Sequence, residues 1–427
     1  MAGRPGDVAR TQLEYLLWRE ERSYSEMAAQ FEAVARSLGE QATITDRHLR
    51  RLASGERQSA TPVTRRVFQA MFGQPLDVLL GPWRGESPVA GTVALNDREM
   101  LEMAANRARK FTLTAQSNLT GEGMDQIHDD VAALATAYQQ RPLTEILPQL
   151  IQVQDDLFTL LEGHQPPAYT RRLLLLTSVV SGLLGKSSHD LGDPHAALTQ
   201  ARTAYLCADQ ADHNGMRAWI RGIQSLVAYW AGRHHEAVRY AQQGAQVAAT
   251  STASIWLPVG EARAWAALGN SAAARAAIER AEDGWARVQP DEVDELGGIC
   301  TFSRARQLYY AADALAWLPS EAEAAEQYSM EAVAAYSDTT APEWAFGDSA
   351  GSSCDLAVAR VMRGEIAGAS EALQPVLGLP PEQRINGIVA SVKHVHRALT
   401  TLPRSAETTE LQEQIEMFAR TPLVQPR

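Results

Sequence analysis

Apolar residues recur at helical spacing along nearly the whole of this 427-residue chain, and this period limits the possible folds more than any other feature. No stretch of strictly alternating apolar and polar residues, bounded by turn residues, competes with it. From about Tyr169 the period becomes a loose repeat, in which a Gly ends one helix and an Ala follows five residues later, as in Gly192 with Ala197. The sequence therefore predicts an all-α fold built from successive helix pairs.

The Gly-Ala spacing marks the repeat units. It recurs at Gly232 with Ala237, Gly269 with Ala274, and Gly364 with Ala369. The interval of 95 residues between the last two Gly predicts a degenerate unit near Pro319, with Ala324 in the place of the Ala. A second small residue comes twelve positions after the Gly, as Ala204, Gly244 or Ala281. Small residues at such fixed offsets let the second helix of one pair approach the first helix closely.

This arrangement resembles the tetratricopeptide repeat, in a stretched and degenerate form, over roughly residues 169–399. The resemblance implies a right-handed superhelical array of antiparallel helix pairs. We assign residues 169–425 to this array and residues 98–168 to connecting helices that include a first helical hairpin.

The segment from Arg84 to Asn96 reads RGESPVAGTVALN and carries Gly, Pro and Ser in place of a helical period. It predicts a linker over residues 84–97, which separates a small domain at residues 1–83 from the rest of the chain. The formal net charge is −12, but residues 1–84 hold twelve Arg against ten acidic residues. Because the acidic excess lies beyond the linker, only the small domain is suited to contact nucleic acid.

Helix start and stop signals divide the small domain into five short helices. Ser23 and Glu26 form the Ser-x-x-Glu pattern of a capping box. Thr45 is placed to cap a helix that begins at Asp46, and Gly55 ends that helix. A further helix starts at Thr61-Pro62, with a cap and a first-position Pro.

With these signals the domain resembles the Cro and lambda-repressor (Xre) class of helix-turn-helix domains. The matching residues are Ser23, Met27-Ala28, Ile44-Thr45, Leu49, Leu52, Gly55-Glu56-Arg57, Thr61-Pro62 and the closing LDVLLG at 76–81. The resemblance implies double-stranded DNA as a partner, with the helix capped by Thr45 as the recognition helix in the major groove.

Carried onto this chain, the resemblance makes Asp46, Arg47 and Arg51 the base-reading positions. Arg can bind guanine through two parallel hydrogen bonds, and a carboxylate can accept from the cytosine amino group. Since Leu49 and Leu52 face the core of the domain, the pattern turns outward Arg47, His48, Arg50 and Arg51. Phosphate contacts are expected from Ser23, Tyr24 and Arg57.

The spacing departs from the family at one place. Ala28 and Thr45 lie 17 positions apart, so 16 residues separate them, whereas the family has about six residues between these two positions. Residues 30–43 hold Phe31, Val34, Ala35 and Leu38 at helical spacing. This pattern predicts a lengthened second helix followed by a looser turn, which bears on how the domain docks on DNA.

Other classes of protein are disfavoured. The longest apolar stretch, residues 173–184, is too short for a bilayer, and the N-terminus lacks an apolar secretory segment, so we expect a cytoplasmic, nucleoid-associated protein with no membrane partner. Neither His234-His235 nor His394 with His396 has metal-ligand spacing, and the three Cys are expected to be buried free thiols. No phosphate loop, nucleophile elbow or zincin motif occurs, so neither a cofactor nor catalysis is expected.

Aromatic residues concentrate in the repeat array. If each unit is aligned on its Gly, one face of the first helices turns aromatic and charged side chains toward a concave groove. These candidate ligand-binding residues are Trp219, Tyr229, Trp256, Arg263, Arg306, Tyr309 and Asp313. Such a groove would suit a short peptide or a small anionic molecule, because Arg holds carboxylates through two hydrogen bonds. Plain packing of the aromatic side chains is the alternative interpretation.

The sequence thus favours a ligand-responsive, DNA-binding transcriptional regulator. We expect it to act as a homodimer, since a single small domain, the DNA-binding head, contacts too few phosphates for tight binding. It resembles peptide-sensing regulators of this design and similar Ala- and Arg-rich proteins of filamentous actinomycetes, which implies quorum or developmental control. The alternative is a non-enzymatic adaptor, whose array would scaffold protein partners.

Overall fold

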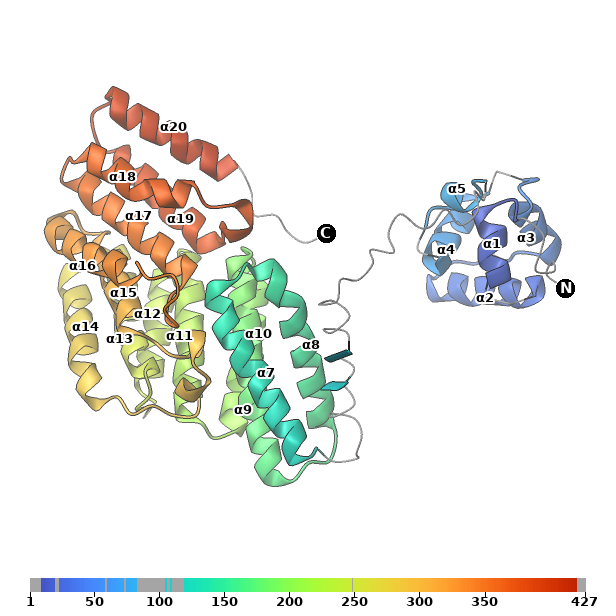
Figure 1. Cartoon of the computed structure of the whole chain (residues 1–427), viewed down its shortest axis with the longest axis horizontal. Coiled ribbons are helices and arrows are strands. Elements are labelled where there is room, and N and C mark those ends of the chain that lie inside the picture. The colour runs from blue at the N-terminus through green and yellow to red at the C-terminus, as the bar shows by residue number, and fades with distance from the viewer. Residues whose placement is uncertain are drawn as a thin grey trace. The chain divides into compact units, whose positions relative to one another are not determined.

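The computed structural model describes residues 9–19, 23–57, 60–72, 74–82, 104–105, 108–109, 119–247 and 249–420. The chain divides into two compact units, Met1–Asn106 and Arg107–Arg427. Apart from one isolated bridge between Thr11 and Pro82, every regular element of the described residues is a helix, which confirms the all-α prediction (Figure 1). The predicted linker at 84–97 lies outside the described residues.

The first unit is a small helical bundle around one core. Its helices are α1 (Gln12–Arg19), α2 (Tyr24–Ser37), α3 (Asp46–Ala53), α4 (Pro62–Phe72) and α5 (Leu76–Leu79). The rings of Phe31 on α2 and Phe68 on α4 lie 5.3 Å apart at the centre of the core. Leu49 of α3 is fully buried against them. The apolar face of α3 therefore packs on the core and holds the helix in place.

The predicted caps of this bundle are confirmed. The amide of Glu26 donates to the Ser23 hydroxyl at 3.2 Å, and the Ser23 amide donates back to the Glu26 carboxylate at 2.8 Å. Thr45 accepts from the amide of His48 at the start of α3. Gly55 has a φ of 77°, the left-handed conformation that Gly adopts most readily at the end of a helix. Sequence signals thus located the helix boundaries correctly.

The lengthened second helix is also confirmed. Helix α2 spans 14 residues and buries Phe31 and Ala35, as its spacing predicts. Leu38 departs from the expected apolar face, because it follows the last turn and is 47% exposed. Gly39, with a φ of 72°, then starts the long connection to α3. Helices α2 and α3 are therefore joined by a connection at residues 38–45, which agrees with the looser turn that the spacing predicts.

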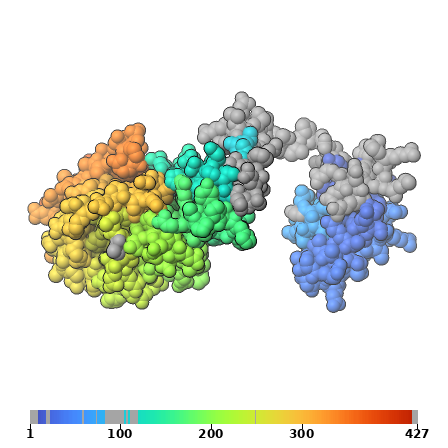
Figure 2. All heavy atoms as spheres, turned by 90° about the horizontal axis from the view of Figure 1, so that it is seen from below, coloured from blue at the N-terminus to red at the C-terminus, as the bar shows by residue number. Residues whose placement is uncertain are grey.

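The second unit is an array of helices joined mostly by short turns (Figure 1). These helices are α7 (Gly121–Gln140), α8 (Leu143–Glu162), α9 (Pro167–Asp190), α10 (Pro194–Gln210), α11 (Asn214–Trp230), α12 (His234–Ala245), α13 (Ala253–Ala267), α14 (Ser271–Gly284), α15 (Arg304–Leu315), α16 (Ala322–Ala335), α17 (Phe346–Met362), α18 (Ile366–Leu377), α19 (Asn386–Leu399) and α20 (Ala406–Arg420). Consecutive helices pack as pairs from α9 with α10 through α17 with α18. Figure 2 shows their side chains meeting in one continuous surface from the green α8 to the yellow α14.

The Gly-Ala repeat has the predicted role. The four Gly lie between the two helices of a pair in the left-handed conformation, and each following Ala is fully buried: Gly192 with Ala197, Gly232 with Ala237, Gly269 with Ala274, and Gly364 with Ala369. At the second small position, a Cβ on Gly244 would lie 2.6 Å from the Leu257 side chain of α13. The small residue there is therefore required by the close approach of the next pair.

The degenerate unit exists, but its buried Ala is one residue later than predicted. Ala325 is fully buried, whereas Ala324 is only partly buried. The turn between α15 and α16 contains no Gly, and Pro319–Glu321 forms a 3₁₀ turn (η4) before α16 begins. This extra turn shifts the register of the second helix by one residue.

The array curls so that its distant parts meet, with α17 against α7 and α19 against α9.

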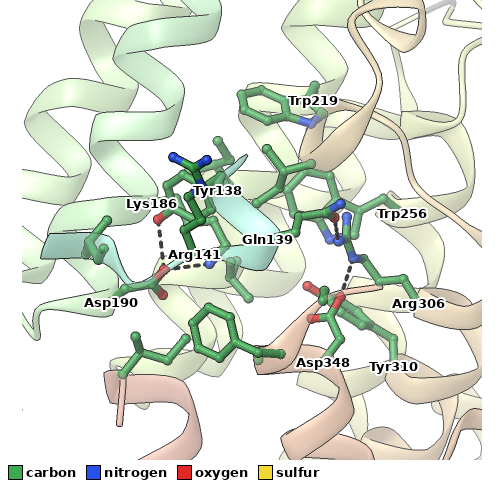
Figure 3. A pocket seen from close by; sticks show the side chains of 18 residues that line it. Tyr138, Gln139, Arg141, Lys186, Asp190, Trp219, Trp256, Arg306, Tyr310 and Asp348 are labelled. Carbon is green, nitrogen blue, oxygen red and sulfur yellow. Dashed lines mark hydrogen bonds and ion pairs between the residues drawn. The ribbon is translucent and has the colours of Figure 1, made fainter. Parts of the chain in front are cut away.

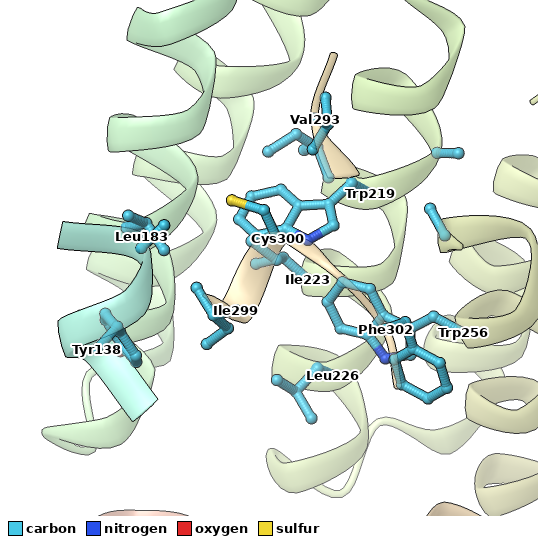
Figure 4. Close-up of a cluster of buried hydrophobic side chains, with 14 of the residues drawn as sticks. Tyr138, Leu183, Trp219, Ile223, Leu226, Trp256, Val293, Ile299, Cys300 and Phe302 are labelled. Atoms are coloured by element: carbon cyan, nitrogen blue, oxygen red, sulfur yellow. The ribbon is translucent and has the colours of Figure 1, made fainter. Parts of the chain in front are cut away.

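An irregular segment, residues 285–303, follows α14 and contains three short 3₁₀ turns: η1 (Trp285–Arg287), η2 (Asp294–Leu296) and η3 (Gly298–Cys300). We call residues 293–302 the plug, because their side chains fill the space between the first helices of the pairs (Figure 4). The open groove predicted from the repeats is therefore largely filled.

The plug is held by specific contacts. Phe302 stacks on Trp256 of α13, with ring centres 6.0 Å apart and planes 11° from parallel. The Phe302 amide donates to the Thr252 hydroxyl at 2.9 Å. Gly298 lies so close to α7 that a Cβ there would be 2.4 Å from the carbonyl oxygen of Ala135. The plug thus joins the start of the array to its middle.

The three Cys residues are buried and unpaired, as predicted. Among the described helices, none combines the length and the apolar character needed to cross a bilayer. Within the same residues, no three His, Cys, Asp or Glu side chains come together as a metal site.

Candidate functional site

A pocket lies at the centre of the curled array, where its first and later helices face one another (Figure 3). It encloses about 650 Å³ of space, including the open mouth. Large side chains from several helices narrow it to a slot, suited to a small molecule or one extended side chain. Its lining comprises Tyr138, Gln139, Arg141, Leu143, Lys186, Asp190, Trp219, Ile223, Leu226, Trp256, Ile299, Arg306, Tyr310, Ala345, Phe346, Gly347, Asp348 and Ile385.

Arg306 on α15 joins three parts of the fold at one side of this central pocket. Its Nε donates to Asp348 on α17 at 2.7 Å, its Nη1 donates to the carbonyl of Thr301 in the plug at 3.3 Å, and its Nη2 donates to Gln139 on α7. Only 8% of its surface is exposed. A buried guanidinium is tolerated here because a carboxylate neutralises it and two oxygens accept from it.

A second polar group lies on the opposite side, between α7 and α9. The carboxylate of Asp190 accepts from the Tyr138 hydroxyl at 2.8 Å and from the Lys186 ammonium at 2.7 Å. Burial, with the neighbouring Asp190 charge, raises the pKa of Tyr138 well above its ordinary value. Tyr138 therefore remains a neutral hydrogen-bond donor at physiological pH.

The remaining wall determines what the central pocket can hold. Trp219 and Trp256 supply two apolar ring surfaces that meet at an angle, with ring centres 6.1 Å apart and planes at 65°. The side-chain amide nitrogen of Gln139 is buried and has no hydrogen-bond partner. Arg141 adds an exposed cation at the lining. An apolar ligand that carries a carboxylate or carbonyl oxygen matches this combination of donors and rings.

Next to this pocket the array contains a buried polar cluster. The Nε of Arg263 on α13 donates to Asp313 on α15 at 2.5 Å, and the Tyr229 hydroxyl donates to the same carboxylate oxygen at 2.8 Å. The guanidinium lies 4.4 Å from the ring centre of Tyr229 and 4.2 Å from that of Tyr310. Arg263 is 2% exposed, so this cluster belongs to the interior.

The predicted ligand-binding residues therefore separate into two groups. Trp219, Trp256 and Arg306 line the central pocket. Tyr229, Arg263 and Asp313 do not line it and belong to the adjacent buried cluster, where Asp313 accepts from the other two, although Tyr229 and Asp313 also border a second pocket. Tyr309 is also buried and does not line the central pocket.

Sequence reasoning missed the residues of the central pocket that come from outside the aligned repeat face. Tyr138 and Gln139 lie on α7, before the repeats, and Asp348 follows the long connection after α16. Only the curl of the array brings them to Arg306. A Tyr-Gln pair at a helix end carries no signal that could have identified it.

The predicted DNA-binding residues lie together in the first unit. On α3, the side chains of Leu49, Leu52 and Ala53 are buried, whereas Arg47, Arg50 and Arg51 are exposed, as predicted. Arg47 forms no hydrogen bond or ion pair with the described residues, and Arg51 pairs at 3.7 Å with Glu56, both at least half exposed. Such an exposed pair is worth at most about 1 kcal/mol and is readily exchanged.

Contacts with neighbouring residues determine which side chains of α3 are exposed. The Arg50 guanidinium lies 5.2 Å above the ring of Tyr24, which connects the starts of α2 and α3. His48 is partly buried instead of pointing outward, and its Nε2 is enclosed without a partner. Burial, with the charges of Arg57 and Arg51, lowers the pKa of His48, so this side chain is neutral at physiological pH. The exposed face of α3 is therefore formed by its arginines and Asp46.

Comparisons with known proteins give only distant structural matches. No protein-family model matches the chain. No curated protein matches it either. Among solved structures, a Rap protein in complex with competence and sporulation factor is similar over 70% of this chain and 96% of its own, with 10% identity and a TM-score of 0.36. The tetratricopeptide domain of P58(IPK) covers 93% and 97%, with 10% identity and a TM-score of 0.20. At these TM-scores neither match bears on function.

Proposed function

We propose that this protein is a sequence-specific, DNA-binding transcriptional regulator whose helix array binds a small-molecule or peptide signal. The observation that carries the proposal is the arrangement of α3. A side-chain cap at Thr45 starts the helix, buried leucines hold it from behind, and exposed arginines at positions 47, 50 and 51 remain for a partner. Arginines on a helix supported in this way can reach base edges in a major groove.

The charge distribution supports the same assignment. The chain has a net charge of −12, so the protein as a whole does not attract DNA electrostatically. Local cations on α3 must supply the attraction to phosphates. Arg65 and Arg66 form closer surface pairs, with Asp77 at 2.7 Å and with Glu40 at 2.5 Å, than Arg51 forms with Glu56 at 3.7 Å, and Arg47 forms none with a described residue. The arginines of α3 are therefore the better candidates for DNA contacts.

Signal binding belongs to the central pocket in this proposal. A ligand that accepts from Gln139 and fills the slot beside Trp219 contacts α7, α11 and the network of Arg306 together. Because that network joins α7, the plug and α17, the ligand can change the curl of the array. In a homodimer, such a change would alter the separation of two heads that must meet half-sites about 34 Å apart.

An adaptor that binds other proteins is the second candidate. Ile151 and Phe158 lie seven residues apart on α8, two helical turns, and are 47% and 36% exposed. An apolar stripe of this kind is typical of a surface that receives a partner helix.

Selection of bound fragments from random-sequence DNA by the full-length protein distinguishes the two candidates. The regulator predicts enrichment of one sequence motif at 0.15 M salt, and binding that weakens steeply with increasing salt. Recovery of unenriched DNA, or no recovery, would contradict it. The triple variant Arg47→Ala, Arg50→Ala, Arg51→Ala is the control and should enrich no motif.

A further inference from the structure

A second pocket lies in the array, separate from the central one. It is formed where the end of α11 and the start of α12 face α15 and α19, and it encloses about 620 Å³, including its mouth. None of its lining residues lines the central pocket. We call it the α19 pocket, because Lys393, His394 and Arg397 of that helix form one of its walls.

Aromatic rings form the other walls. His394 stacks on Trp317 with ring centres 4.3 Å apart, and the ring of His234 meets the same Trp317 edge-on at 6.1 Å. Trp230 completes this surface beside Tyr229, at 5.0 Å. Flat, apolar walls of this kind favour a planar ring over a branched aliphatic group.

The charges exclude a cationic ligand. Asp313 is the only acidic residue in the lining, and its carboxylate already accepts from Arg263 and from Tyr229. Lys393 and Arg397 lie one helical turn apart on the same face of α19, and neither forms an ion pair with a described residue. The pocket is therefore locally positive, although the chain as a whole is acidic. Aromatic walls alone would attract a cation, but the Arg397 guanidinium already lies 5.5 Å from the ring centre of Trp317. Together with Lys393 it repels a second cation.

A buried ring nitrogen without a hydrogen-bond partner also supports ligand binding in this pocket. The Nδ1 of His234 is enclosed and has no hydrogen-bond partner. Burial lowers the pKa of His234, and it lowers the pKa of His394 to about 4. Both rings are therefore neutral near pH 7 and offer hydrogen bonds without an additional positive charge.

From this geometry we infer that the α19 pocket binds a planar aromatic carboxylate. The ring lies against Trp230 and Trp317, and the carboxylate lies at the rim with Lys393 and Arg397. This site lies within the second unit and shares no lining residue with the central pocket. Its occupant would bridge α11, α15 and α19, three helices from three different pairs.

Isothermal titration of the full-length protein tests the inference with three probes: 1-naphthoate, its neutral amide and acetate. Binding of 1-naphthoate is expected, with the amide at least fivefold weaker and no binding of acetate at the same concentration. The variants Lys393→Gln and Arg397→Gln should each weaken 1-naphthoate about fivefold, the effect of one exposed ion pair. Both side chains are exposed, so folding should not change, which thermal melts would verify.

Two matched controls locate the probe. Arg404→Gln removes an exposed cation from the same end of the array and should not alter 1-naphthoate binding. Arg141→Gln removes one from the central pocket, so it should weaken only a second binding event there and leave the event that depends on Lys393 and Arg397 unchanged. The inference is overturned if the amide binds as well as the acid, if acetate competes equally, or if Arg141→Gln weakens binding while the α19 variants do not. The last result would place the probe in the central pocket and leave the proposed regulator intact.

Discussion

Arg263 and Asp313, 50 residues apart in sequence, form an ion pair at 2.5 Å in the interior of the array, with side-chain exposures of 2% and 3%. The pair joins α13 to α15 and is surrounded by the rings of Tyr229 and Tyr310. A buried charge that loses its partner cannot recover its hydration, so this contact is costly to break from one side.

The first prediction follows directly. Asp313→Ala should lower the free energy of unfolding by about 3–5 kcal/mol, because it leaves Arg263 buried and unpaired. Asp125→Ala, which removes the exposed partner of Arg172, should cost less than about 1 kcal/mol. Urea denaturation of both variants measures the difference. Equal effects would mean that the pair is not buried as described.

The position of the plug can be tested at one Gly. Gly298→Ala places a Cβ 2.4 Å from the Ala135 carbonyl oxygen and should displace the plug from α7. Gly269→Ala is the matched control, because Gly269 also has a positive φ, 77° against 54°, yet a Cβ there meets no atom within 4 Å.

The control should cost about 1–2 kcal/mol through the left-handed backbone alone. Gly298→Ala should cost clearly more and should expose Trp256, which the plug residue Phe302 covers. Denaturation and tryptophan fluorescence report the two effects. If both variants lose the same stability and Trp256 remains shielded, the plug does not pack against α7 as described.

Stability should decrease as the pH falls from about 6.5 to about 4. Burial lowers the pKa of His189 and of His394 to about 4, whereas the unfolded chain has the ordinary value near 6.5. The unfolded state therefore binds more protons in this window, and each His costs the folded state up to about 3 kcal/mol at its acid end. Urea midpoints at pH 7.5, 6.0 and 5.0 measure the slope.

A variant separates this effect from the general loss of carboxylate interactions in acid. His394→Gln should reduce the pH slope between 6.5 and 5, while His195→Gln, at an exposed position of α10, should leave it unchanged. An unaltered slope in His394→Gln would show that His394 is protonated in the folded protein.

The structure also shows which features a sequence can predict. Gly192 and Ala197 were located correctly because a left-handed turn residue and a close helix contact each demand one residue type. Thr45 was identified as a cap for the same reason. Local chemistry determines such positions, and it can be recognised without knowledge of distant parts of the chain.

The central pocket could not be predicted in this way. Gln139, Arg306 and Asp348 meet only because α7 and α17 approach each other after the array curls. The plug lacks a helical period, so nothing in its sequence indicated that Phe302 would cover Trp256. For this reason the sequence predicted an open groove where the structure has a narrow pocket.

The base preference of α3 tests the proposed function most directly. Fluorescence anisotropy would compare the full-length protein, Arg47→Ala and Arg51→Ala on the selected DNA sequence and on a series of single base-pair changes in it. We expect each variant to lose about 1–3 kcal/mol of discrimination at particular base pairs, while Arg57→Ala weakens binding to all sequences alike. If the double variant Arg47→Ala, Arg51→Ala bound and discriminated as the unaltered protein does, α3 would not be the helix that reads DNA.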